Sequence, residues 1–99
     1  MAKNEQQPVG PPAKLIAEVK TELRVASPRP PAVLSDKLDL TIDLRLTDDN
    51  KRGLAAPFQT IAQEFQPRAQ VSRDECGDLT TVGDAVNLVA NKAGFSKEQ

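Results

Sequence analysis

Apolar side chains recur at helical spacing in three short segments of the chain, and this pattern limits it to small helical folds. Spacings of three, four and seven residues place each set on one face of a helix. The stripes are too short for a coiled coil but long enough for a small antiparallel bundle. We therefore predict an all-α fold of three main helices and one short helix. The three stripes are Leu15, Ile16, Val19 and Leu23; Phe58, Ile61, Ala62 and Phe65; and Val82, Ala85, Val86, Val89 and Ala93.

Start and stop signals give the predicted helices their bounds, at 13–25, 54–66, 72–78 and 80–93. Ser72 is placed to cap the short helix, and Thr81 with Asp84 approximates a capping box for the last one. Gly94 follows at a natural C-cap. Pro57 either opens the second main helix or kinks one that begins near Asn50.

A long connection separates the first and second main helices. Three prolines between residues 28 and 31 break the first helix and enforce an extended loop. Beyond them, residues 38–46 read LDLTIDLRL and alternate strictly between apolar and polar side chains. The period of two favours a strand, but no second segment of similar quality exists to pair with it. The alternatives are an edge strand in a homodimer, part of a helix, or a loop whose leucines fill the bundle.

The remaining composition excludes several classes of function. The 99 residues suit a single domain, and the chain has no His, one Cys, three aromatic residues and a net charge of −1. Histidine, the commonest general base, is therefore lacking, as are structural zinc sites and disulfide frameworks. The charge and the few aromatics also argue against a nucleic-acid binder. We expect a binding role and no enzyme activity, cofactor or metal site.

The ends of the sequence give further expectations. Residues 1–12 are polar and proline-rich, and we predict a disordered arm there, a helical domain at 13–94 and a tail at 95–99. No apolar run approaches the ~20 residues that span a membrane, and the first residues lack the apolar segment of a secretory signal. We expect a cytoplasmic protein, and a monomer.

The order of these elements, together with one motif, resembles the acyl carrier protein family over about residues 13–93. The run Leu79–Val86 reads LTTVGDAV, similar to the start of that family's last helix. Residues 62–65 are similar to the end of its second helix, and residues 42–48 are placed like its approach to that helix. The resemblance implies a helical carrier bundle whose partners are enzymes of fatty-acid, lipid or polyketide metabolism.

The resemblance fails at the residue that gives such proteins their chemistry. The family attaches 4′-phosphopantetheine to a Ser at the start of the second helix, within Asp-Ser-Leu. Here the stretch reads Thr47-Asp48-Asp49-Asn50-Lys51, and either Asp49 or Lys51 stands at the Ser position. No Ser lies between Ser35 and Ser72. We therefore expect a carrier-like fold without its prosthetic arm, and the alternative is a carrier modified at Thr47 or Ser35.

Acidic side chains are concentrated in residues 36–49, which lead into that stretch and include its first residues. The resemblance implies an acidic docking surface, and we assign it to Asp39, Asp43, Asp48 and Asp49. Asp48, Asp49 and Asn50 also suit helix N-caps. A metal site would need more oxygen ligands than these residues offer.

Two further features have a plain explanation and a functional one. Phe58 and Phe65 either fill the core or line an acyl pocket. Cys76 lies among carboxylates that disfavour its thiolate, so we interpret it as incidental and not as an acyl acceptor. A third hypothesis for the protein is a small interaction module that dimerises through residues 38–46.

Overall fold

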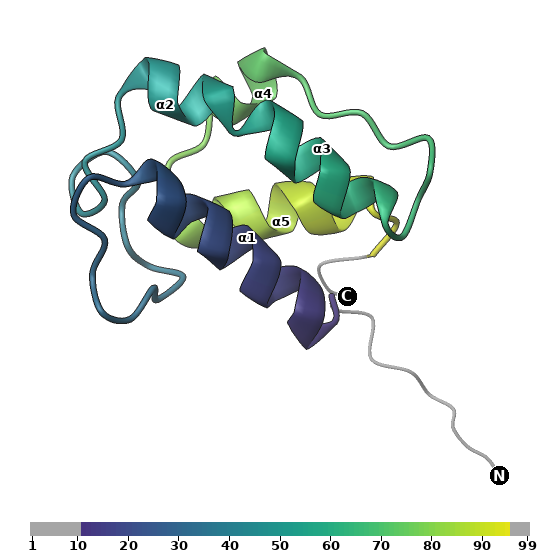
Figure 1. Ribbon diagram of the computed structural model, residues 1–99, viewed down its shortest axis with the longest axis horizontal. Coiled ribbons are helices and arrows are strands. Elements are labelled where there is room, and N and C mark those ends of the chain that lie inside the picture. Colours follow the sequence, from purple (N-terminus) through teal and green to yellow (C-terminus); the bar gives the residue numbers. More distant parts are fainter. Residues whose placement is uncertain (1–10, 96–99) are drawn as a thin grey trace, which may run out of the picture.

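Five helical segments make up the fold in the computed structural model, which describes residues 11–95 (Figure 1). They are α1 (Ala13–Ala26), α2 (Asp48–Gly53), α3 (Ala55–Gln63), α4 (Arg73–Gly77) and α5 (Val82–Lys92). Helices α1, α3 and α5 pack against one another, and α2 packs against α4. The part of the chain that the structure describes contains no strand, and a long loop joins α1 to α2. The predicted all-α bundle is confirmed.

The second main helix is broken into α2 and α3 at Leu54. Pro57 has no N–H to donate to the carbonyl of Gly53, four residues earlier, so the regular helical bonding cannot pass this point. The Leu54 N–H instead bonds the Lys51 carbonyl at 3.1 Å, and Phe58 N–H resumes the helical pattern on the Leu54 carbonyl at 2.9 Å. The structure combines the two alternatives for Pro57: a helix begins at Asp48 and breaks at Leu54, and Pro57 lies in the first turn of the helix that follows.

The second main helix also ends earlier than predicted, at Gln63 instead of residue 66. The N–H groups of Glu64 and Phe65 bond carbonyls three residues back, at 3.1 Å each, which tightens the end of the helix. Phe65 is half-buried just beyond it.

Helix α5 is capped at both ends. Thr81 Oγ1 accepts from Asp84 N–H at 3.1 Å, and an Asp84 carboxylate oxygen accepts from Thr81 N–H at 3.2 Å. The predicted capping box is therefore present. Ser72 caps α4 in the same way, with Glu75 as the reciprocal partner, at 3.1 and 3.0 Å.

The C-terminal end of α5 closes in a Schellman motif. The Phe95 N–H bonds the Ala90 carbonyl at 2.8 Å, and the Gly94 N–H bonds the Asn91 carbonyl at 3.1 Å. Gly94 has φ of 95°, a left-handed conformation that glycine adopts without a steric penalty. The Phe95 ring then meets the Phe65 ring edge-on, with centroids 5.4 Å apart. The packed chain thus extends one residue past the domain end predicted at 94; residues 1–10 and 96–99, in the predicted arm and tail, lie outside the described residues.

The alternating segment 38–46 is not a strand. Leu40, Leu44 and Leu46 are buried in the core, while Ile42 remains 71% exposed. Its only pairing within residues 11–95 is an isolated bridge between Asp39 and Thr81. The strand favoured by the period of two is wrong, and the alternative of a loop that fills the bundle with leucines is confirmed.

A single helical turn explains why Ile42 leaves the alternating pattern. Asp39 Oδ1 accepts from the N–H groups of Thr41 and Ile42 at 2.7 and 2.8 Å, as an N-cap does. The Asp39 carbonyl accepts from Asp43 N–H at 2.9 Å and closes the turn. Arg45 then takes a left-handed φ of 62°, at a cost of about 1 kcal/mol, and reverses the chain.

Backbone hydrogen bonds fasten this loop to the start of α5. Gly83 permits the contact, because a Cβ there would lie 3.1 Å from the Asp36 carbonyl oxygen. Two of the first N–H groups of α5 thereby find acceptors in the loop. The three bonds are Leu40 N–H to the Thr80 carbonyl at 2.8 Å, Val82 N–H to the Leu38 carbonyl at 2.9 Å, and Gly83 N–H to the Asp36 carbonyl at 2.9 Å.

Two truncations in the alternating segment should have very different effects on stability. Leu40→Ala removes a fully buried side chain and is expected to lower the free energy of unfolding by about 2–5 kcal/mol. Ile42→Ala, the control two residues away, is expected to change it by less than about 0.5 kcal/mol. Denaturant unfolding of both variants measures the difference, and equal losses would show that both side chains face the same environment.

Candidate functional site

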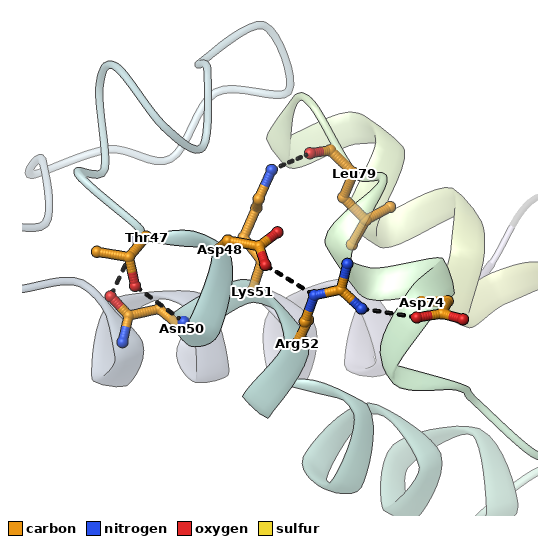
Figure 2. A network of polar contacts seen from close by, with 7 residues as sticks. All are labelled: Thr47, Asp48, Asn50, Lys51, Arg52, Asp74 and Leu79. Carbon is orange, nitrogen blue, oxygen red and sulfur yellow. Dashed lines mark hydrogen bonds and ion pairs between the residues drawn. The ribbon is translucent and has the colours of Figure 1, made fainter.

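The start of α2 is the region where the sequence predicts a degenerate attachment site, and Thr47 is its N-cap. Thr47 Oγ1 accepts from Asn50 N–H at 3.1 Å, and Asn50 Oδ1 accepts from Thr47 N–H at 3.1 Å (Figure 2). The sequence-based assignment of the cap to Asp48, Asp49 or Asn50 is therefore wrong. Thr47 takes this position because Asn50, three residues on, completes a reciprocal capping pair.

Asp48 belongs to an ion-pair network that joins α2 to α4. Arg52 Nε donates to Asp48 Oδ2 at 2.8 Å, and Arg52 Nη1 donates to Asp74 Oδ1 at 2.6 Å (Figure 2). These hydrogen bonds, with that to Asp48 the larger, raise the pKa of the Arg52 guanidinium above its ordinary value. Gly77 makes room for the group, since a Cβ there would lie 3.0 Å from the guanidinium carbon. Because Asp74 is 91% exposed, we expect the network to orient α4 more than to stabilise the fold.

Lys51 is also engaged within the fold. Its Nζ donates to the Leu79 carbonyl at 3.0 Å, from a half-buried position (Figure 2). The bond ties α2 to the chain just before α5. Lys51 thus holds two parts of the bundle together.

The structure divides the four carboxylates of the predicted docking surface between two sites. Asp39 and Asp43 lie in the loop turn, where Asp43 Oδ2 accepts from Asp39 N–H at 2.7 Å and Asp39 binds the N–H groups described above. Asp48 and Asp49 lie in the first turn of α2. Asp49 is exposed and has no ion pair with another residue between 11 and 95. Three of the four carboxylates therefore have a structural partner, and Asp49 is the one whose charge faces solvent without one.

The phenylalanines and the cysteine lie in the hydrophobic core. Phe58 is fully buried, and Phe65 packs partly against the core beside Phe95. Cys76 is also fully buried. Burial, with a smaller contribution from the charge of Glu75, raises the pKa of the Cys76 thiol to about 11. It is therefore protonated and inaccessible at neutral pH, the opposite of what an acyl acceptor requires.

Neither a metal cluster nor a spanning helix occurs in residues 11–95. No three or more His, Cys, Asp or Glu side chains there are grouped so as to hold a metal ion. None of the helices in that range has the length and apolar character needed to cross a membrane. Comparison of the chain with protein-family models, curated proteins and solved structures found no match.

Two features of this site were missed by sequence reasoning. The pattern Thr47-x-x-Asn50 is a capping box with Asn in the usual place of Glu or Gln, and it could have identified the cap. Arg52 lies four residues after Asp48, a spacing that predicts their ion pair. The third member, Asp74, comes from another helix, and its contact depends on how α2 and α4 pack.

Removal of the Thr47 hydroxyl tests the capping assignment. Thr47→Ala is expected to lower the free energy of unfolding by about 1 kcal/mol, because Asn50 N–H loses its acceptor. Thr47→Ser keeps the hydroxyl and should cost much less. Thermal or urea unfolding compares the two variants, and an Ala variant as stable as the Ser variant would contradict the assignment.

Proposed function

We propose that this protein is a carrier-like binding protein that lacks a phosphopantetheine arm and works by docking to partner proteins. The arrangement of a first helix, a long loop, a kinked second helix, a short helix and a capped last helix supports the proposal. So does the run LTTVGDAV, whose Thr81 and Asp84 form the cap of α5. Partners in fatty-acid, lipid or polyketide metabolism follow from the resemblance to acyl carrier proteins.

The observation that carries the proposal is that the first turn of α2 contains no Ser or Thr after its N-cap. The four residues Asp48–Lys51 have carboxylate, amide or ammonium side chains, none of which can form a phosphodiester. The adjacent hydroxyl, on Thr47, is the helix cap. Thioester carriage by the family's usual route is therefore not open to this chain.

Docking, in this proposal, uses the exposed first turn of α2. Asp49 supplies a charge that forms no ion pair with another residue of the described range 11–95, and Asp48 lies beside it with 65% of its side chain exposed. The protein acts as a cytoplasmic monomer and binds no nucleic acid. Asp39 and Asp43 support this surface indirectly, by shaping the loop before it.

The second candidate function is a true carrier modified at a non-standard hydroxyl. Its supporting observation is that Thr47 is exposed at the start of the second helix. Ser35 is exposed too, but it lies in the loop, where its Oγ accepts from Lys37 N–H at 3.2 Å. Dimerisation by strand pairing is not proposed, because residues 38–46 form a turn whose leucines fill the core.

Intact-mass measurement after co-expression with a phosphopantetheinyl transferase separates the two candidates. The proposal predicts the unmodified mass, while a carrier with an intact Asp-Ser-Leu in the same cells gains one phosphopantetheinyl group. A gain on this chain would overturn the proposal. Thr47→Ala and Ser35→Ala would then assign the modified residue.

A restored motif provides the matched control. In Asp49→Ser with Asn50→Leu, the chain reads Asp-Ser-Leu from residue 48, and we expect it to gain the group. Loss of the Asn50 cap partner costs about 1 kcal/mol at most, so unfolding is measured beside the mass. A folded double variant that stays unmodified would remove the support for a carrier-like surface.

A further inference from the structure

An open groove of about 440 Å³ runs between α1 and α3, away from the start of α2. Helices α1 and α3 pack against each other. Pro57 and the nearly buried Ile61 give it an apolar surface. Its polar lining consists of Glu18, Thr21 and Glu22 from α1 and Thr60 and Glu64 from α3 and its end.

A lysine already sits at the edge of this groove between two of its carboxylates. Lys14 Nζ lies 2.7 Å from Glu64 Oε1 and 3.0 Å from Glu18 Oε2. The hydrogen bonds to Glu64 and then to Glu18 raise the pKa of Lys14, and the bond from Lys14 lowers the pKa of Glu64. Lys14 is 64% exposed, so the ammonium is held at the solvent side. The two glutamates are thus spaced to share one cationic donor.

The other polar atoms of the groove are acceptors as well. Glu18 Oε1 is buried and has no hydrogen-bond partner within residues 11–95. The hydroxyls of Thr21 and Thr60 donate to carbonyls of their own helices, at 2.9 and 3.1 Å, which leaves their lone pairs to accept. Glu22 has no ion pair with a residue in 11–95. Three carboxylates and two hydroxyl oxygens therefore face one ammonium.

We propose that this groove binds an arginine side chain presented by a partner protein. Guanidinium is the side-chain group that best fits such a lining, because it has five donors, no acceptor and a planar fork that matches carboxylates. The methylene stem of an arginine can lie along Pro57 and Ile61 while its head reaches the carboxylates. An open groove admits a side chain carried on another polypeptide. This inference rests on the groove alone and does not use the resemblance to carrier proteins.

Titration with a short peptide, observed by amide chemical shifts at low salt, tests the proposal. The probe is acetyl-Gly-Ala-Arg-Ala-Gly-amide, and shifts are expected at the amides of Thr21, Glu22 and Ile61. Glu22→Gln should weaken binding about fivefold, since it removes one of the three carboxylate charges of the groove. Lys14→Gln should strengthen binding by a similar factor, because it removes the competing ammonium. Asp49→Asn, outside the groove, should leave the Kd unchanged and so separates this site from the surface at the start of α2.

The proposal requires opposite changes in Kd, with weaker binding for Glu22→Gln and tighter binding for Lys14→Gln. The spectra themselves report that each variant is folded. The same peptide with citrulline in place of arginine should produce no shifts in the groove. Equal shifts with citrulline would overturn the proposal, as would arginine-dependent shifts confined to residues 36–49. Groove shifts with spermidine but none with the peptide would indicate a polyamine site instead. Absence of any shift at roughly 10 mM peptide, which saturates a site of millimolar Kd, would also overturn it.

Discussion

The attachment of the loop to the start of α5 is the constraint on which the rest of the structure depends. Backbone groups of residues 36–40 bond those of residues 80–83, so a segment without regular structure is fixed on the bundle. This position lets Leu40, Leu44 and Leu46 complete a core that the helix stripes alone leave open. It also delivers the chain to Thr47, where α2 begins. The position of the candidate surface on α2 is thus set more by this loop than by a neighbouring helix.

The predictable part of the fold was the part governed by local chemistry. Helical spacing located the buried faces of α1, α3 and α5, and the caps at Ser72, Thr81 and Gly94 follow from their own side chains or backbone freedom. For segment 38–46 the period of two alone favoured a strand, but the lack of a second segment to pair with it favoured the loop that the structure shows. An alternating pattern indicates only which side chains can be buried, and not which backbone conformation buries them. Here a turn capped by Asp39 leaves four of the five apolar side chains of the segment wholly or partly buried and turns the fifth, Ile42, outward.

In the candidate site too, local features could be predicted from the sequence and tertiary contacts could not. The sequence identified the stretch Thr47–Lys51 and its lack of Ser, but it placed the cap one to three residues after Thr47. It also grouped Asp39 and Asp43 with Asp48 and Asp49. Tertiary contacts decide these points: Arg52 is held to Asp74 of α4, and Lys51 to the Leu79 carbonyl. The groove between α1 and α3 has no counterpart in the sequence at all, because Glu18 and Glu64 meet through the packing of two helices.

Amide hydrogen exchange at the contacts between the loop and α5 measures whether the loop is fixed to the bundle. The N–H groups of Leu40, Val82 and Gly83 donate across this contact, and we expect protection close to that of Val86 and Val89 inside α5. The exposed loop amide of Lys37, whose acceptor is a serine side chain, should exchange much faster. Exchange of Leu40, Val82 and Gly83 as fast as that of Lys37 would show that the loop is not fixed to the bundle.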